Sequence, residues 1–434
     1  MTFKLKLSVL SIKITVALKK MFGNPPADYV GEVCLRIFPG FMQNFLKEIT
    51  LPEHMVFVVG SDGKSTVHNL ITECMKGTEH LLLENSEHDK GLKGIATLLF
   101  ENTTSAGIPK INTAVFEIKE EELETVLKLI KPSHLVCTNI SRPNYAVNGE
   151  VSCEIDLAKV ISRSISSDTK FILCGDDAAS FNLCPQNERA YYGISVLEEE
   201  ETALYAGYNK DVVVCPLCGS IVEYDMYRFG NHGKFHCTND GCDFKNPEEI
   251  KYSVEKFTLD TATYTFNKLN ILLPDTSLHN IYNFSAAISF LSEFGLNFPK
   301  IKDGLKNAKI RNKTWELIGA SIIHYNFVNA DSPISLSLAF DEVRAAVGTK
   351  SVVLLFDYEK LIDMYDADFE FLRHENISAV YCKDNIDLQL RLLIAGIDEE
   401  KISDISEFDI SGTNEVFVLY NDDSELEKFK SKIK

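Results

Sequence analysis

Between about residues 55 and 185, short apolar runs alternate with stretches whose apolar residues recur at helical spacing. Four of the runs are rich in residues that favour strands: 55–60, 114–118, 134–140 and 171–177. After the first run, apolar side chains from Val67 to Met75 repeat every three or four positions, which predicts an amphipathic helix. Strands that alternate with helices in this way are typical of βαβ crossovers, so we expect a mainly parallel sheet.

The rest of the chain predicts an insertion, another helix and a second α/β region. Residues 205–250 break the alternation with Cys, Gly, Asn and aromatic residues, which indicates an insertion. A helix is expected just before Gly295, which stands where a C-terminal cap would lie. The polar, basic stretch 307–314 is interpreted as a linker. Beyond it lie three apolar runs and one helical pattern: 351–357, 377–382, 415–420 and, for the helix, 385–397.

These patterns predict an α/β protein with two domains. The first is a central parallel-sheet domain over residues 49–306, with the insertion at about 210–247, and the second is a smaller Rossmann-like domain over residues 315–434. Residues 1–48 form a basic amphipathic helix and a lead-in. A length of 434 residues fits two or three domains of ordinary size.

The N-terminal helix is expected to have one apolar face, with lysines elsewhere. The residues of that face are Leu10, Ile14, Ala17, Leu18 and Met21. Such a helix docks on the protein's own body or on an anionic membrane, and we favour the body. Lys13 interrupts the apolar stretch and no small-residue cleavage pattern follows, so we expect neither a transmembrane anchor nor a signal peptide.

Composition and charge exclude some classes of protein. Hydrophobic residues make up 45% and charged residues 25% of the chain, which is ordinary for a globular protein and excludes wholesale disorder. The net charge of −19 repels a phosphate backbone, so we expect no nucleic-acid partner. Seven of the eleven cysteines are scattered, mostly through apolar runs, as buried thiols are, which favours a reducing, cytoplasmic setting.

The other four cysteines are paired at short spacing: Cys215, Cys218, Cys237 and Cys242. Eighteen residues separate the two pairs, a pattern typical of a zinc ribbon. Four thiolates complete a tetrahedral Zn²⁺ site and leave no open position, so the role of the metal is expected to be structural. His232 and His236 lie nearby and are expected to stay outside the ligand set.

A candidate phosphate loop follows the first apolar run and precedes the predicted helix. Its residues are Gly60, Ser61, Asp62, Gly63, Lys64, Ser65 and Thr66. The glycines let backbone amides point at a phosphate, and the helix N-terminus adds the positive end of its dipole. Lys64 would reach the β- and γ-phosphates of a nucleotide and Ser65 would bind Mg²⁺. The alternative is a tight glycine turn with an exposed lysine.

A magnesium site needs an acidic partner, and Glu117 lies in the second apolar run. A charge in an apolar strand is costly unless it is paired, so we interpret Glu117 as a Mg²⁺ ligand. The alternative is a carboxylate that faces solvent on an edge strand.

The loop, the glutamate strand, the Thr138-Asn139-Ile140 strand end and the helix motif with Asn280 and Asn283 together resemble the Mur ligase family. Within that family, the inserted ribbon and the second α/β region are similar to the MurT-type subunit of lipid II isoglutaminyl synthase. The resemblance runs over nearly the full chain. It implies a Mur ligase-like central domain that binds ATP and Mg²⁺, with Asn280 and Asn283 near the nucleotide.

The resemblance also implies an activity and a partner. The subunit would phosphorylate the α-carboxylate of the D-glutamate in the lipid II stem peptide, with Lys64 and Glu117 in catalysis. Ammonia from a separate GatD-type glutaminase would attack the acyl phosphate, and the lipid-linked substrate leaves peripheral membrane contact open. Asp357 or Asp363 could orient the glutaminase histidine, because direct alignment places Lys360 at the position of the family's aspartate.

Several positions depart from the family pattern. Ser61 and Asp62 replace Thr-Asn in the loop, and segment 141–150 lacks two acidic residues. Thr314 and Asn329 stand where the family has an arginine and a lysine. Two alternatives therefore stay open: a diverged paralogue that binds nucleotide or a partner without full turnover, and another Mur-type ligase, similar to folylpolyglutamate synthase, that uses an amino acid as nucleophile.

Overall fold

The chain forms two compact units in a computed structural model. The first unit comprises Met1–Ile140, Ile155–Ser195 and Pro247–Ile310, and the second comprises Ser141–Glu154, Val196–Asn246 and Arg311–Lys434. The structure describes residues 2–23, 25–36, 40–104, 106–141, 153–194, 210–258, 263–266, 269–272, 277–308, 314–329, 332–356, 367–383, 385–410 and 415–433. Each unit is considered by itself.

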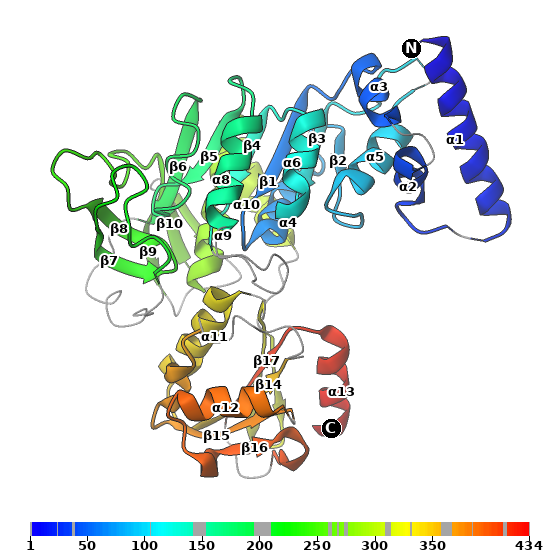
Figure 1. Cartoon of the computed structure of the whole chain (residues 1–434). Helices are drawn as coiled ribbons and strands as arrows, with labels where there is room; N and C mark the ends of the chain where they lie inside the picture. The colour runs from blue at the N-terminus through cyan, green and yellow to red at the C-terminus, as the bar shows by residue number, and fades with distance from the viewer. Residues whose placement is uncertain are drawn as a thin grey trace. The chain divides into compact units, whose positions relative to one another are not determined.

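A sheet of nine strands runs through the first unit, in the order β11-β10-β9-β6-β5-β4-β1-β3-β2 (Figure 1). The seven strands from β9 to β2 are parallel, and β10 and β11 add an antiparallel edge. The strands are β1 (His54–Val59), β2 (Leu82–Glu84), β3 (Thr113–Glu117), β4 (His134–Cys137), β5 (Lys170–Cys174), β6 (Arg189–Ile194), β9 (Tyr252–Thr258), β10 (Thr263–Phe266) and β11 (Leu269–Leu272). The prediction of a mainly parallel sheet is confirmed, and its four apolar runs are β1, β3, β4 and β5.

Helices cover both faces of this sheet, which explains why its central strands are apolar on both sides. In β1, Phe57 packs in a core with α5, α6 and α8, while the buried Val56 and Val58 point to the opposite face, where α4 and α9 pack. The helices are α4 (Lys64–Met75), α5 (Leu92–Glu101), α6 (Glu120–Leu129), α8 (Cys153–Ser164), α9 (Leu278–Glu293) and α10 (Phe298–Asn307). Gly295, with φ +93°, follows the end of α9 as predicted.

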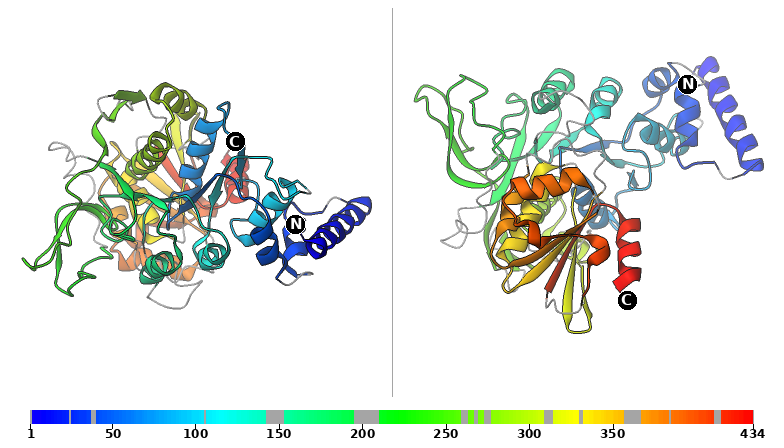
Figure 2. Two further views of the ribbon diagram at one scale, coloured as in Figure 1. Left: turned by 90° about the horizontal axis from the view of Figure 1, so that it is seen from above. Right: turned by 60° about the horizontal axis from the view of Figure 1, so that its bottom comes forward.

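Three N-terminal helices form a second small core together with one side of α5: α1 (Phe3–Met21), α2 (Tyr29–Arg36) and α3 (Phe41–Glu48). The helix α1 packs on the body of the unit through Leu5, Ile12 and Val16. The expected face is therefore wrong, because Leu10 and Ile14 on the opposite side are exposed. Both views of Figure 2 show α1 at the outer margin of this helical cluster.

The second unit contains a six-stranded sheet in the order β12-β13-β17-β14-β15-β16, parallel except for the β12–β13 hairpin. Its strands are β12 (Thr314–Ile318), β13 (Ser321–Phe327), β14 (Lys350–Leu355), β15 (Ile377–Cys382), β16 (Ile402–Asp404) and β17 (Glu415–Tyr420). Its helices are α11 (Pro333–Ala345), α12 (Ile386–Ile394) and α13 (Asp423–Ile433), with short 3₁₀ turns that include η4 (Phe369–Arg373). The predicted runs correspond to β14, β15 and β17, and the predicted helix to α12.

The insertion, called the ribbon below, folds as a β-hairpin of β7 (Val222–Phe229) and β8 (His232–Cys237), flanked by two cysteine-bearing turns. In sequence it lies between β6 and β9 of the first sheet, whereas its contacts group it with the second unit. Six of the seven scattered cysteines are buried as expected, and the side chain of the seventh, Cys153, lies outside the description. In the described part of the chain, no helix has both the length and the apolar character needed to cross a membrane.

Candidate phosphate-binding site and metal centre

The loop between β1 and α4 has a conformation that requires its two glycines. Gly60 has φ +130° and Gly63 has φ +80°, values that residues with a side chain rarely adopt. A Cβ atom on Gly60 would lie 2.2 Å from Thr138 Oγ1, and one on Gly63 would lie 2.1 Å from Asn283 Oδ1. Both positions therefore exclude larger residues by space as well as by backbone angle.

The end of β4 braces this loop from the neighbouring strand. Asn139 accepts hydrogen bonds from the backbone N–H of Ser61 (3.0 Å) and of Asp62 (3.0 Å). Thr138 Oγ1 donates to the carbonyl oxygen of Asp62 at 2.6 Å, and Asn139 Nδ2 donates to the same oxygen at 3.0 Å. The Thr-Asn pair thus fixes the loop at the carboxyl edge of the parallel sheet, where α/β proteins bind their ligands.

Lys64 is the first residue of α4, and its side chain curls back over the loop. Its Nζ donates to the carbonyl oxygens of Gly60 and of Ser61, the latter at 2.8 Å. It also lies 3.9 Å from Glu120 Oε1, at the start of α6. Burial raises the pKa of Glu120, and the nearby Lys64 charge partly offsets this. The ammonium group therefore lies at the loop, where a bound anion can replace the carbonyl oxygens as its hydrogen-bond acceptor.

Ser65 and Glu117 come together as the sequence predicted. Ser65 Oγ donates to Glu117 Oε1 at 2.7 Å, and Lys90 Nζ lies 3.6 Å from Glu117 Oε2. β3 lies between β1 and β2, and Glu117 is 6% exposed, so it is not a solvent-facing carboxylate on an edge strand. The side chain of Asn85 holds the Glu117 backbone through two hydrogen bonds of 2.9 Å. A hydroxyl and a carboxylate in contact at the edge of a phosphate loop are oxygen ligands of the kind that Mg²⁺ prefers.

The predicted asparagines of α9 lie on the other side of the loop. Asn283, which is buried, touches Gly63 and donates from Nδ2 to Asn280 Oδ1 at 3.0 Å. Asn280 is buried beside it and orients the amide of Asn283. Thr66 lies in the first turn of α4, directly after the loop. The structure therefore brings together all nine predicted residues of the nucleotide site.

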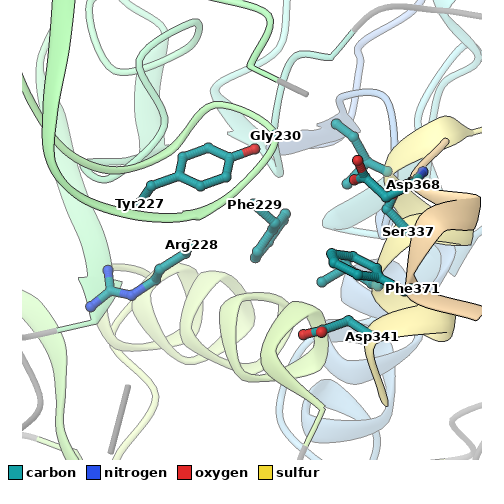
Figure 3. Close-up of a pocket in the computed structure, with 10 residues that line it drawn as sticks. Tyr227, Arg228, Phe229, Gly230, Ser337, Asp341, Asp368 and Phe371 are labelled. Carbon is teal, nitrogen blue, oxygen red and sulfur yellow. Dashed lines mark hydrogen bonds between the residues drawn. The ribbon is translucent and has the colours of Figure 1, made fainter. Parts of the chain in front are cut away.

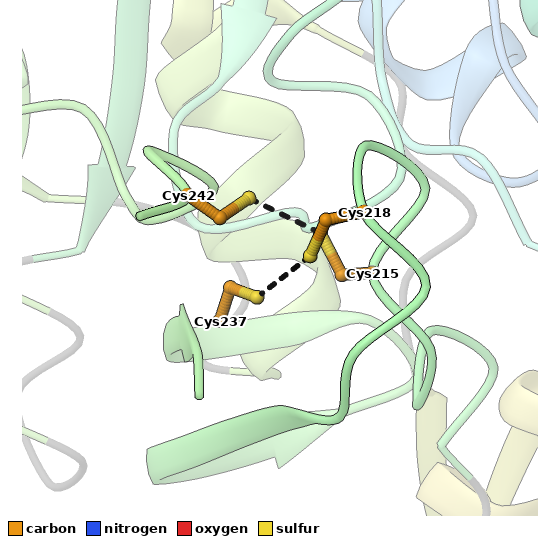
Figure 4. Close-up of side chains that lie close together, drawn as sticks. All are labelled: Cys215, Cys218, Cys237 and Cys242. Atoms are coloured by element: carbon orange, nitrogen blue, oxygen red, sulfur yellow. Dashed lines mark hydrogen bonds between the residues drawn. The ribbon is translucent and has the colours of Figure 1, made fainter. Parts of the chain in front are cut away.

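The four clustered cysteines form a second candidate centre, in the ribbon (Figure 4). Their Sγ atoms all lie within 4.8 Å of one another, with Cys215 and Cys242 at 3.6 Å and Cys218 and Cys237 at 3.4 Å. The ring of His232 instead stacks on Phe229, at 4.4 Å between centroids.

The geometry of the cysteines fits one tetrahedral ion. With a zinc–sulfur distance of about 2.3 Å, two thiolates of a tetrahedral site lie about 3.8 Å apart, close to the separations seen here. Backbone hydrogen bonds hold both turns: Gly219 N–H donates to the Cys215 carbonyl oxygen at 2.9 Å, and Asn239 N–H donates to Cys237 Sγ at 3.5 Å. The latter bond orients and stabilises a thiolate ligand.

The chain is similar to known proteins in its sequence and in its fold. The chain is 26% identical over 398 residues to the MurT subunit of a glutamine-hydrolysing lipid II isoglutaminyl synthase from Staphylococcus aureus, covering 89% of this chain and 87% of that one. The chain is MurT-like and has the fold of the Mur ligases.

Solved structures show the same fold. A pseudomurein peptide ligase type C from Methanothermus fervidus has a TM-score of 0.64 at 18% identity, over 91% of this chain and 81% of that one. MurF from Acinetobacter baumannii has a TM-score of 0.60 at 12% identity, over 91% and 78%. No family model matches the chain. The predicted Mur ligase-like fold of this MurT-like chain is confirmed.

Some predicted positions of the MurT-like chain lie outside the described residues. They are Asp357, Asp363, Lys360 and most of segment 141–150. Sequence reasoning in turn missed Asn85, Lys90 and Glu120, which surround the loop. Asn85 and Lys90 come from the segment after β2, which reaches the site only because β2 pairs with β3. Glu120 could have been predicted, because it follows the end of the Glu117 strand by only three residues and therefore lies at the same edge of the sheet.

A small pocket in the second unit was not expected from the sequence (Figure 3). It lies between the end of β7 and the segment of α11 and η4, and it has room for about one water molecule. Two carboxylates line it, Asp341 and Asp368. Burial raises the pKa of Asp341 to about 6, while Arg344, which donates to it at 2.8 Å, partly offsets this. The pocket is too small for a nucleotide.

Proposed function

We propose that the MurT-like chain is the ATP-dependent, amide-forming subunit of a lipid II isoglutaminyl synthase, acting in peptidoglycan biosynthesis. Its substrate would be the α-carboxylate of D-glutamate in the stem peptide. The observation that carries the phosphoryl chemistry is the hydrogen bond between Ser65 and Glu117 beside Lys64 at the end of β1. The similarity to MurT over 89% of the chain supports the substrate.

The reaction has two balanced steps. A carboxylate oxygen of the substrate attacks the γ-phosphorus of ATP, the bond to the bridging oxygen breaks, and ADP leaves. Ammonia then attacks the carbonyl carbon of the acyl phosphate, inorganic phosphate leaves with the bonding electrons, and the nitrogen loses a proton. Activation is needed because a free carboxylate has no good leaving group, and phosphorylation provides one.

The residues of the loop would act by binding and orientation. Backbone amides of Gly63, Lys64 and Ser65 at the N-terminus of α4 would bind the phosphates, and Lys64 would move from the loop carbonyls to phosphate oxygens. Ser65 and Glu117 would hold Mg²⁺, which supplies charge neutralisation for the transferring phosphoryl group. Asn283 and Asn280 would support the loop from α9 and lie near the nucleotide. In the ribbon, four cysteines would hold a structural Zn²⁺.

Ammonia would come from a separate glutaminase of the GatD type that forms a heterodimer with this chain. The proposed setting is cytoplasmic, where ATP and the inward-facing lipid-linked substrate meet. Asp357 or Asp363 would orient the glutaminase histidine, as the resemblance implies. No nucleic acid takes part, in agreement with the net charge of −19.

The test is co-purification with a glutaminase encoded beside this chain, followed by incubation with lipid II, ATP and glutamine. We expect a product in which one carboxyl hydroxyl is replaced by an amino group, detected by mass spectrometry. Ammonium should replace glutamine when the glutaminase is inactivated. A stable complex that hydrolyses glutamine yet leaves lipid II unchanged would refute the amidation.

A second candidate, a diverged paralogue that binds nucleotide without turnover, is favoured by the charge balance around the loop. Two lysines, Lys64 and Lys90, face three carboxylates there: Asp62, Glu117 and Glu120. A triphosphate would then depend on Mg²⁺ for much of its charge compensation. This candidate predicts ATP binding without release of ADP in the presence of lipid II and ammonium.

A further inference from the structure

We propose that the outer face of α1 is a docking surface for a lipid bilayer that contains anionic phospholipids. The inference does not depend on the proposed ligase activity, because it rests on one helix of the first unit and is tested without ATP. It concerns six side chains, called here the outer stripe: Phe3, Leu7, Leu10, Ile14, Leu18 and Met21.

The helix α1 has two apolar faces on opposite sides. At about 3.6 residues per turn, Leu5, Ile12 and Val16 lie on one face, half a turn away from the outer stripe. The first face is buried: Ile12, for example, is 0% exposed in a core with α2 and α3. The side chains of the outer stripe are between 48% and 79% exposed. Packing on the body therefore leaves a complete second apolar face uncovered.

The placement of α1 keeps the outer stripe accessible along its length. Thr2 caps the helix through its side chain and bonds to Glu48 at the end of α3, with Oγ1 donating at 2.7 Å. The buried face fixes the rotation of the helix about its axis. Since α1 lies at the outer margin of the N-terminal cluster (Figure 2), the outer stripe points away from the α2–α3 core.

Charge decides which occupant fits this face. Residues 2–27 contain five lysines and no acidic residue, in a chain whose net charge is −19. Lys6, Lys13 and Lys20 are exposed and, on helical geometry, form a row along one border of the outer stripe. An apolar face bordered by lysines matches the interface of an anionic bilayer, where apolar side chains insert and ammonium groups meet lipid phosphates.

The same charges disfavour a second copy of this chain as the occupant. An antiparallel isologous pairing of two outer stripes would bring two rows of lysines together without compensating carboxylates on either helix. A bilayer, by contrast, supplies negative charge along the whole row. The apolar side chains also outnumber the border lysines, which suits insertion at the level of the lipid headgroups rather than electrostatic attraction alone.

Vesicle co-sedimentation of the full chain tests the proposal. The probes are vesicles of equal parts phosphatidylglycerol and phosphatidylcholine, and vesicles of phosphatidylcholine alone. Three variants are compared with the wild type: Leu10→Ser/Ile14→Ser/Leu18→Ser on the outer stripe, Lys6→Gln/Lys13→Gln/Lys20→Gln on its border, and a control, Ile386→Ser/Leu390→Ser/Ile394→Ser. The control removes a matched number of exposed apolar side chains from α12 in the second unit. Circular dichroism checks that each variant is folded.

We expect wild-type chain to sediment with the anionic vesicles and at least about tenfold less with the neutral ones, since each lysine near an anionic surface contributes about fivefold. The outer-stripe variant should lose at least about tenfold in partitioning and the control less than about twofold. Absence of wild-type binding to anionic vesicles, or equal binding by the outer-stripe variant, overturns the proposal. If the wild type formed dimers and bound no vesicles, while the outer-stripe variant stayed monomeric, the face would be assigned to a second copy of the chain instead.

Discussion

At the level of single residues, Lys64 offers the most direct test of the phosphate loop. Its ammonium group bonds to loop carbonyls and is proposed to move to phosphate oxygens when a nucleotide binds. Lys64→Ala should weaken binding of ATP with Mg²⁺ by about tenfold to a hundredfold, because a hydrogen bond to a charged group contributes about 1.5–3 kcal/mol. Isothermal titration calorimetry measures this.

The matched control is Lys76→Ala, directly after the same helix, where the lysine pairs with Glu73 at the surface. It should leave the affinity for ATP unchanged within about twofold, because exposed pairs of this kind contribute little. Equal affinities of wild type and Lys64→Ala would contradict the phosphate-loop assignment.

Gly63 offers a test of the loop conformation itself. Gly63→Ala should lower the free energy of unfolding by about 1–3 kcal/mol, because φ is +80° and the new Cβ atom would meet Asn283 Oδ1 at 2.1 Å. Gly77→Ala is the control, since φ there is +72° but no atom lies within 4 Å. The excess cost of Gly63→Ala over Gly77→Ala, measured by urea denaturation, should shrink when Asn283→Ala is added. If adding Asn283→Ala left this difference in unfolding free energy unchanged, the side chain of Asn283 would not be the group that the new Cβ atom meets.

His134, at the start of β4, makes stability depend on pH. Burial lowers its pKa to about 4, with the charge of His54 adding to the effect. Because the unfolded chain binds the proton more tightly, the stability of the first unit should fall as pH drops from about 6.5 to about 4, by at most about 3 kcal/mol. Urea denaturation followed by circular dichroism at several pH values should show a flatter profile for His134→Gln. His236→Gln, at a half-buried position in the second unit, should keep the wild-type slope of the first unit.

At the level of elements, the ribbon should depend on its metal. Cys237→Ser removes one of four ligands, so we expect the metal content to fall from about one ion per chain to substoichiometric values. Elemental analysis by mass spectrometry measures the content, and hydrogen exchange should rise in β7 and β8 but not in the six-stranded sheet. Thr238→Ala, which leaves every ligand in place, is the control. Full metal content in Cys237→Ser would show that four thiolates are not needed.

The elements that could be predicted from the sequence are those whose burial leaves a simple pattern. β1 and β4 are covered on both faces, so their runs are continuously apolar. β6 was missed because its two tyrosines are only partly apolar, so it does not stand out as an apolar run; Tyr192 is fully buried, with its hydroxyl within hydrogen-bond distance of the carbonyl oxygens of Cys137 (2.9 Å) and Thr138 (2.7 Å). Those partners depend on the order of the strands, which no local pattern gives.

The same distinction applies to the site and to α1. Lys64 and Ser65 could be predicted because strand, loop and helix are contiguous in sequence. Lys90 could not, since strand pairing brings it to Glu117 from a separate segment. For α1, the period of the apolar residues indicated a helix, but two opposite faces are apolar and only the tertiary contacts select the buried one.

At the level of the whole molecule, the two candidate centres lie in different compact units. The phosphate loop belongs to the first unit and the four cysteines belong to the second, and each unit has cores of its own. In the second unit, Thr314 and Asn329 stand where the resemblance implies an arginine and a lysine. Ligands of the two centres should therefore stabilise different units.

Differential scanning calorimetry combined with hydrogen exchange checks this expectation. At about one hundred times its dissociation constant, ATP with Mg²⁺ should stabilise the first unit by about 2.7 kcal/mol and slow exchange in α4 and β3. A zinc chelator should destabilise the second unit and leave exchange in α4 unchanged, because the loop has no ligand in the ribbon. Equally strong slowing of exchange in β14 and α11 would contradict this expectation. It would mean that the second unit also binds the nucleotide, with cationic side chains other than those that Thr314 and Asn329 replace.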